Sequence, residues 1–172
     1  MKIEDNLLEQ NVFDKLQTFM MSSDIAWFFN SFVTYDPVIY ETKEEKDFQF
    51  IHIFYNQDSP TSPFCEKLNP IFEKMKATSM WRIKANLRTR ISKNIENEFH
   101  CDMGHISEEK QKQWTTSIFY INTNNGYTEF EDGTKVESVA NRMITFPTNL
   151  KHRGTSCTDE KLRVVINFNY FR

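Results

Sequence analysis

The sequence lacks a hydrophobic run long enough to cross a membrane, and it has few cysteines. No stretch approaches the roughly 18 uninterrupted apolar residues of a membrane helix. Residues 1–6 also lack the apolar run of a signal peptide. The cysteines, Cys65, Cys101 and Cys157, are odd in number and widely spaced, which argues against a disulfide framework. We therefore expect a cytoplasmic protein without a membrane partner.

The chain also lacks a net positive charge and a zinc-protease motif. Its net charge of −3 and pI near 5.8 are unlike those of a dedicated nucleic-acid binder, so we do not expect nucleic acid as a partner. No His-Glu-x-x-His segment is present, which argues against a metalloprotease helix. Hydrophobic residues at 39% and aromatic residues at 15% exclude a disordered composition. A chain of 20.6 kDa suits one domain with a hydrophobic core.

Apolar periodicity predicts two helices and a series of strands. The helices are expected at residues 9–21 and 64–76, where Pro70 can shift the start of the second. Polar loops are expected at residues 41–47 and 106–113. An Asp132-Gly133 pair predicts a tight hairpin. Strands are expected at residues 27–29, 48–55, 81–91, 114–122, 136–139, 142–146 and 162–170, with a short strand or connection at residues 3–8.

Many short strands after two helices predict a mainly β protein with flanking helices. The expected core is a double-stranded β-helix, that is, a jelly roll or cupin-like fold. We expect a single domain over residues 1–172. Within it, residues 1–80 supply helical support and outer strands, and residues 81–172 supply the jelly-roll core.

The residues with the clearest chemical meaning are His100 and Asp102, in a stretch with a strand-like pattern. Residues two apart on a strand point to the same face, so an imidazole and a carboxylate can meet one metal ion. Cys101 would face the other way and should not coordinate. His152 lies far enough along the chain for a sheet to bring it back. Two histidines and one carboxylate on one side of a metal leave positions open, as in non-haem Fe(II) oxygenases.

Arg163 is the fourth candidate, on the strand predicted at residues 162–170. It shares a face with Val165, Asn167 and Asn169. If that face is buried, the guanidinium needs an anion, and its planar fork suits a carboxylate. The alternative is an exposed arginine on a strand.

The order His-x-Asp, distal His, strand Arg resembles the Fe(II)/2-oxoglutarate-dependent dioxygenases, and most closely their small prolyl-4-hydroxylase-like branch. The resemblance extends from Trp81 to the C-terminus, and residues 146–154 look like the turn that presents the distal histidine. It implies Fe(II), 2-oxoglutarate as cosubstrate, O2, and ascorbate as an accessory reductant. The implied metal ligands are His100, Asp102 and His152, and the implied cosubstrate residues are Arg163, Tyr120, Thr116 and Asn167.

The resemblance further implies an enzyme, a hydroxylase that oxidises a C–H bond and releases succinate and CO2. A carboxylate at Asp102 argues for hydroxylation, because halide-using relatives have Gly or Ala there. A prolyl or other peptidyl residue is the first candidate substrate, followed by a free amino acid, a small metabolite or a modified nucleobase. Asn125-Gly126 departs from the Gly-Gly pair that is common in prolyl hydroxylases. The main alternative is a non-catalytic metal-binding jelly roll that acts as a sensor or interaction module.

A row of mostly basic residues lies on the strand predicted at residues 81–91, whose other face is apolar. The row has three interpretations: a solvated face, a contact with phosphates or an acidic substrate, or, for Asn86 and Arg88, the mouth of the pocket. A metal-independent nucleic-acid module would use the basic members of this row. Its members are Arg82, Lys84, Asn86, Arg88 and Arg90. Of the remaining histidines, His52 is expected to be structural and His105 to lie on the surface.

Overall fold

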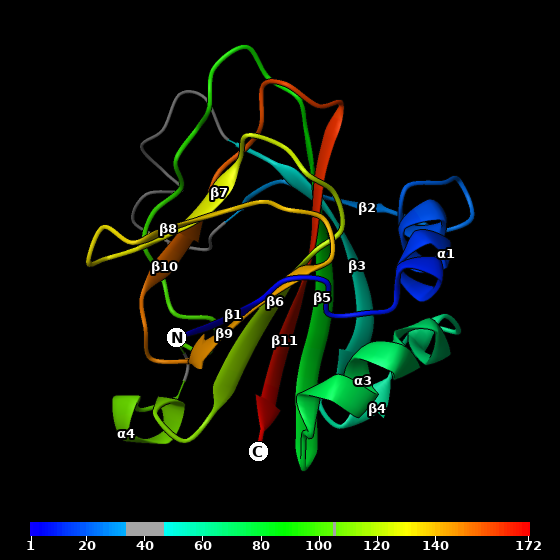
Figure 1. Ribbon diagram of the computed structural model, residues 1–172. Coiled ribbons are helices and arrows are strands. Elements are labelled where there is room, and N and C mark those ends of the chain that lie inside the picture. Colours follow the sequence, from blue (N-terminus) through cyan, green and yellow to red (C-terminus); the bar gives the residue numbers. More distant parts are fainter. Residues whose placement is uncertain (34–46, 105) are drawn as a thin grey trace.

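The computed structural model describes residues 1–33, 47–104 and 106–172 and shows a mainly β protein with two antiparallel sheets (Figure 1). Strands make up 39% and helices 16% of it. In this described part, no helix combines the length and the apolar character needed to cross a membrane. The expected mainly β, jelly-roll architecture is confirmed.

The larger sheet has eight strands among the described residues, in the order β1-β9-β6-β11-β5-β3-β2, with β4 paired to β3. Its strands are β1 (Lys2–Glu4), β2 (Phe28–Asn30), β3 (Gln49–Asn56), β4 (Ser59–Pro60), β5 (Ser79–Thr89), β6 (Thr115–Tyr120), β9 (Arg142–Pro147) and β11 (Leu162–Phe171). The smaller sheet has the order β10-β7-β8 and consists of β7 (Tyr127–Phe130), β8 (Lys135–Glu137) and β10 (His152–Gly154).

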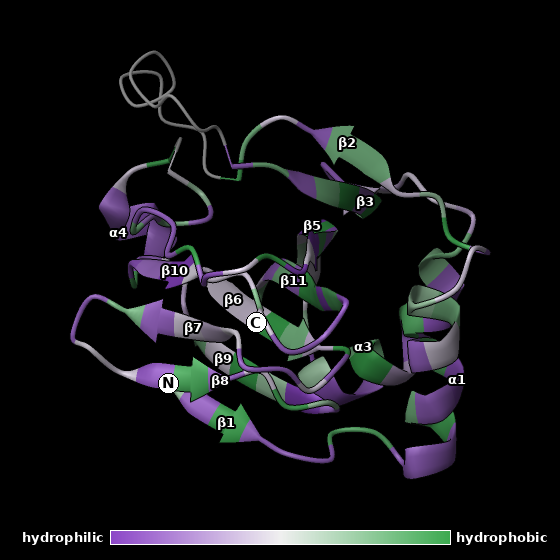
Figure 2. Cartoon of the chain, turned by 90° about the horizontal axis from the view of Figure 1, so that it is seen from above, coloured by the Kyte–Doolittle hydropathy of each residue, from purple (hydrophilic) through white to green (hydrophobic). Residues whose placement is uncertain are grey.

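The helices α1 (Gln10–Met20) and α3 (Asn69–Met75) lie on one side of the larger sheet, and the smaller sheet lies on the other (Figure 1). The periodic apolar side chains of α1, among them Phe13 and Leu16, are buried in a core shared with α3 and the sheet. Figure 2 shows α1 banded in hydrophobic and hydrophilic residues, whereas the short α4 (Glu108–Gln111) is largely hydrophilic. Apolar burial against the helices therefore fixes which face of the sheet is left for the site.

The central strands β5 and β11 separate two environments by simple alternation. The helix side of the sheet receives the apolar residues Ile83, Ala85, Leu87, Val164, Ile166 and Phe168. The intervening residues face the smaller sheet, together with a second apolar cluster that includes Ile118, Tyr120 and Val165. The site is built on this second face.

The structure changes several local expectations. The helix expected at residues 64–76 is a 3-10 turn, η1 (Cys65–Leu68), followed by α3, because Pro70 suits the first turn of an α-helix. The loop expected at 106–113 contains α4, whose first turn carries two glutamates near the helix amino end. The His-x-Asp segment is not a strand: His100 makes only an isolated bridge. The expectations for His105 and for residues 41–46 lie outside the described residues.

The two parts of the chain interleave in the larger sheet. Strand β1 pairs with β9, and β3 pairs with β5, so strands from residues 1–80 continue the sheet formed by residues 81–172. Both ends of the strand order, β1 and β2, come from the first 80 residues.

Candidate metal centre

Backbone pairing brings the distal histidine to the His-x-Asp segment. The N–H of His100 donates to the carbonyl oxygen of His152 at 3.0 Å, and the N–H of His152 donates to the carbonyl oxygen of His100 at 3.0 Å. His152 begins β10, and this mutual bridge joins that strand to the segment after β5. Two residues that are distant in the sequence therefore present their side chains side by side.

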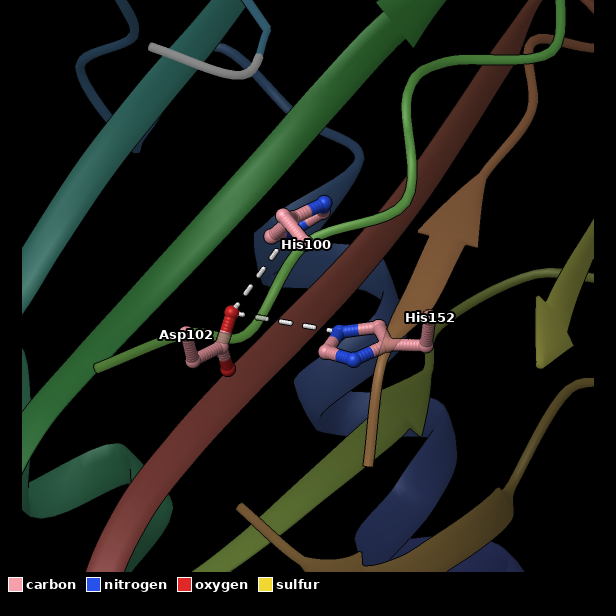
Figure 3. Close-up of side chains that lie close together, drawn as sticks. All are labelled: His100, Asp102 and His152. Atoms are coloured by element: carbon pink, nitrogen blue, oxygen red, sulfur yellow. Dashed lines mark ion pairs between the residues drawn. The ribbon is translucent and has the colours of Figure 1, made fainter. Parts of the chain in front are cut away.

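The three predicted ligand side chains converge on one point (Figure 3). Asp102 Oδ1 lies 3.8 Å from Nε2 of His100 and 3.9 Å from Nε2 of His152. One ligand atom from each residue lies within 4.8 Å of the others. Bonds from these atoms to a transition metal are about 2.0–2.2 Å long, so one ion between them is sterically reasonable.

The hydrogen bonds of both imidazoles leave the same nitrogen for a metal. Nδ1 of His100 lies 3.2 Å from the carbonyl oxygen of Glu98, and Nδ1 of His152 lies 3.2 Å from that of Leu150. Because a carbonyl can only accept, each Nδ1 carries a proton, and in the neutral imidazole the lone pair then lies on Nε2. Such backbone acceptors orient histidine ligands in metal sites.

The charge states also fit a divalent cation. Burial alone would raise the pKa of Asp102, but His152, Arg82 and His100 and a hydrogen bond from Asn169 hold it below its ordinary value. Burial, reinforced by His152, lowers the pKa of His100 to about 4. At neutral pH the centre therefore offers a carboxylate and a neutral imidazole, the forms that bind metal.

Asn169 orients the carboxylate of Asp102 and also contacts Thr116. The Asn169 side-chain amide donates to Asp102 Oδ2 at 2.8 Å and to Thr116 Oγ1 at 3.2 Å. Thr116 Oγ1 also shares a hydrogen bond of 2.9 Å with Thr148. The structure therefore places Thr116 near Asp102, and its role toward the cosubstrate stays a prediction.

Arg163 is buried at 4% exposure on the same face of β11. Its Nε donates to Ser138 Oγ at 2.9 Å and one terminal nitrogen donates to the carbonyl oxygen of Tyr127 at 3.3 Å. Among the described residues it has no carboxylate partner. Burial lowers the pKa of Arg163 to about 10, so it stays positively charged at neutral pH. A buried cation with neutral partners suits an anionic ligand.

Gly126 makes room for this arginine. A Cβ at Gly126 would lie 2.6 Å from Cδ of Arg163 and 2.6 Å from the carbonyl oxygen of Ser156. A side chain larger than hydrogen at position 126 would therefore displace Arg163 or the segment around Ser156.

The other predicted cosubstrate residues lie near this arginine or between it and the metal ligands. The Tyr120 ring centroid lies 5.9 Å from Cζ of Arg163, and its hydroxyl donates to Thr128 Oγ1 at 2.8 Å. Burial raises the pKa of Tyr120, which keeps the phenol protonated as a donor. Asn167 lines the pocket, and its Oδ1 is buried without a hydrogen-bond partner among the described residues.

One pocket between the sheets joins the metal ligands to the basic row of β5. Its lining includes His100, Asp102, His152, Arg163 and Asn167. From β5 it is lined by Lys84, Asn86 and Arg88. Asn86 is 9% and Arg88 is 5% exposed, so the solvated-face interpretation is wrong for these residues, while Arg90 beyond the strand is exposed. The face turns inward because the opposite, apolar face is covered by the helices.

The cations of the β5 row differ in whether a carboxylate lies close to them. Arg88 forms an ion pair with Asp47. Arg82 Nε donates to Asn169 Oδ1 at 3.2 Å, and one of its terminal nitrogens lies 4.0 Å from Asp102 Oδ1. Lys84 has neither an ion pair nor a hydrogen bond with the described residues. Burial, with a smaller effect of Arg82, lowers the pKa of Lys84 to about 8.

Elsewhere His52 is structural, as expected: its ring nitrogens form hydrogen bonds with the carbonyl oxygen of Ala26 at 2.7 Å and with Ser62 Oγ at 2.8 Å.

The sequence did not single out the residues that position the metal ligands and Arg163 through hydrogen bonds or packing. Asn169 was visible only as a member of the Arg163 face. Ser138, which accepts a hydrogen bond from Arg163, carries no sequence signal, and the contact of Gly126 with Arg163 could not be predicted because it joins distant segments.

Searches with protein-family models and against curated protein sequences find no match for this chain. Solved structures do match. A prolyl hydroxylase from Trichoplax adhaerens, in complex with a hypoxia inducible factor peptide fragment, aligns with a TM-score of 0.66 and 12% identity over 99% of this chain and 82% of its own. An oxidoreductase of the 2OG-Fe(II) oxygenase family from Burkholderia pseudomallei aligns with a TM-score of 0.67 and 7% identity, covering 97% and 82%.

A prolyl-4-hydroxylase from Pseudomonas putida matches over 99% of this chain and 92% of its own, with a TM-score of 0.59 and 12% identity. The chain therefore has a 2OG-Fe(II) oxygenase fold of the prolyl-4-hydroxylase-like type, as the sequence resemblance implied. At these identities the likeness concerns the fold, and the chemistry has to be argued from the residues of the pocket.

Proposed function

We propose that this protein is an Fe(II)- and 2-oxoglutarate-dependent oxygenase that hydroxylates a C–H bond and releases succinate and CO2. The observation that carries the proposal is the presence in one pocket of a His-Asp-His cluster and a buried arginine without a carboxylate partner among the described residues. Either feature alone has a structural explanation. Together they match the two needs of the reaction, a metal with open positions and a cation for a dicarboxylate.

In this proposal His100, Asp102 and His152 hold the metal, and Arg163 holds the distal carboxylate of 2-oxoglutarate. Fe(II) held by these three residues would supply the activation of O2 that protein side chains cannot provide. The chain fixes the orientation of its ligands: Glu98 and Leu150 accept from the two imidazoles, and Asn169 donates to Asp102. Asn167 lines the pocket and would contact the cosubstrate, Tyr120 lies buried beside Arg163, and Ile118 and Val165 give the pocket an apolar wall that limits water.

The substrate under this proposal is a peptide or a small molecule that enters the same pocket. A structural relative is a prolyl hydroxylase that holds a peptide, which supports considering a peptidyl residue. The nucleic-acid alternative loses its main support, because Lys84 and Arg88 line the pocket.

The test is succinate formation from 2-oxoglutarate in the presence of Fe(II), O2 and ascorbate. We expect slow turnover even without a primary substrate, and at least a 100-fold loss in Asp102→Ala, because removing an anionic ligand from a three-ligand site strongly weakens metal binding. Cys101→Ser is the matched control: its sulfur contacts the carbonyl oxygen of Asn149 at 3.4 Å, and turnover should persist. If the wild type neither forms succinate nor binds 2-oxoglutarate with Mn(II), the protein is a metal-binding module without this catalysis.

A further inference from the structure

The proposed reaction assigns no role to one charged side chain of the pocket, that of Lys84. Lys84 lies on β5 in register with Asn167 of β11, and both line the pocket beside the metal ligands. It is a half-buried lysine of the pocket lining and, unlike Arg88, it forms no ion pair with the described residues; the Asp102 carboxylate acts on it only from beyond ion-pair distance. A cation held inside a protein without an anion is costly, so such a residue is commonly explained by a ligand.

Two asparagine side chains beside this lysine each have an amide oxygen without a hydrogen-bond partner among the described residues. The Oδ1 atoms of Asn86 and Asn167 are both buried and have no hydrogen-bond partner among the described residues. Asn86 is two residues from Lys84 on the same face of β5, and Asn167 is the cross-strand neighbour of Lys84. Each amide can rotate to present N–H donors, so the three side chains form a group that can donate to an anion.

The carboxylates of 2-oxoglutarate do not account for this group. Arg163 and Asn167 are four positions apart on β11, about 13 Å along a strand, so Arg163 and Lys84, the partner of Asn167 on β5, extend from different ends of the pocket. Under the proposed function the distal carboxylate is neutralised by Arg163, and the other faces the metal, whose second charge is matched by Asp102.

The overall balance of charge leads to the same conclusion. The described cations around the pocket are Arg82, Lys84, Arg88 and Arg163, to which the metal adds two charges. Against them stand Asp47 and Asp102 and the two carboxylates of the cosubstrate. Positive charge remains in excess, and Lys84 is the pocket-lining cation that nothing in this set pairs.

We propose that Lys84, with the amides of Asn86 and Asn167, binds a carboxylate of the primary substrate beside the metal ligands. The substrate is then a small carboxylic acid, such as a free or N-acylated amino acid, and not an uncharged peptidyl residue. This inference rests on the proposed function. It adds a specificity-determining site to the pocket, because an amide in place of the acid leaves Lys84 unpaired.

The test compares acids with their amides on protein loaded with Mn(II) and N-oxalylglycine, an unreactive analogue of 2-oxoglutarate. Calorimetric titrations use N-acetyl-L-proline against N-acetyl-L-prolinamide, and N-acetyl-L-glutamate against N-acetyl-L-glutamine. We expect at least one acid to bind ten-fold or more tightly than its amide. Lys84→Gln should abolish this preference and Lys84→Arg should retain it. Lys15→Gln, on the exposed face of α1, changes the net charge equally and should have no effect.

The outcomes separate the two proposals. If both acids bind no better than their amides, or if the preference survives Lys84→Gln, the inference is wrong. If Lys84→Gln instead weakens N-oxalylglycine binding ten-fold, Lys84 belongs to the cosubstrate and the inference is also wrong. If N-oxalylglycine does not bind at all, the proposed function fails. The acid–amide comparison on the unloaded protein then decides whether Lys84 binds carboxylates.

Discussion

At the scale of single residues, the site consists of charged groups held by neutral neighbours. Asp102 is oriented by Asn169, and Arg163 by Ser138 and a backbone carbonyl. These partners position each charge without neutralising Arg163, which leaves it available to a ligand. Lys84 is the least compensated of these charges, because it forms no ion pair and no hydrogen bond with the described residues. Such a residue should lower the stability of the ligand-free protein.

Replacement of Lys84 by Met should therefore stabilise the ligand-free protein at pH 7. The pKa of Lys84 is about 8 in the folded protein against an ordinary 10.5, so between these values the unfolded chain binds more protons. The lysine's unfavourable contribution is therefore full below pH 8 and fades as the pH rises toward 10.5. We expect Lys84→Met to gain about 1–2 kcal/mol at pH 7 and less at pH 10, measured by urea unfolding. A gain that grows with pH would contradict this sign.

At the scale of elements, the metal ligands lie on short segments, whereas Arg163 and Lys84 lie on the two longest strands. The strands β5 and β11 run side by side over most of their length and carry the basic row and Arg163. The metal ligands, in contrast, stand on β10, which has three residues, and on an irregular segment joined to it by the His100–His152 bridge and by hydrogen bonds from Asn97 to Gly154. A local contact of another kind precedes the first helix, where Asn141 joins the segment before α1 to the turn before β9.

Asn141→Ala should destabilise the protein without changing the site. The Asn141 side chain accepts from the N–H of Leu8 at 3.0 Å and donates to its carbonyl oxygen at 2.8 Å, and its φ is 63°. Loss of both buried bonds and the strain of alanine at positive φ should cost about 2–4 kcal/mol in thermal or urea unfolding. Exposed Asn6, with φ 52°, serves as the control, and Asn6→Ala should cost about 1 kcal/mol from strain alone. Equal losses in both variants would show that the Leu8 bonds contribute nothing.

At the scale of the whole molecule, the pocket joins two sheets that have separate hydrogen-bond ladders. Arg163 and Lys84 come from the larger sheet and His152 from the smaller one. A metal ion bound by His152 and by the segment after β5 would therefore bind the folded arrangement and not the unfolded chain. Binding of this kind stabilises the fold by mass action.

Mn(II) should accordingly raise the Tm of the protein. At a free concentration about 100 times its Kd the gain is about 2.7 kcal/mol, or about 5–10 °C for a chain of this size. Differential scanning fluorimetry should show this increase in the wild type and in Cys101→Ser, and chelation should reverse it. The increase should be absent in Asp102→Ala. An equal increase in that variant would place the bound metal elsewhere.

Much of this organisation follows from local patterns in the sequence. Alternation predicted which residues of 162–170 share the face of Arg163, and helical periodicity predicted the buried side of α1, as the structure confirms. The metal ligands could be proposed because two of them lie two residues apart. The sequence did not predict that the His-x-Asp segment lies outside a regular strand, because its conformation is set by the bridge to His152.

The sequence by itself determined the faces of the strands, since the pleat makes alternate residues point to opposite sides whatever the strand pairs with. Only the tertiary structure decided which of those faces is a solvated surface and which is a pocket. The basic row of β5 turns inward because helices α1 and α3 cover the apolar face and the smaller sheet lies over the other. Lys84 and Asn167 become neighbours through the register of β5 with β11, and that register depends on contacts across about 80 residues of chain.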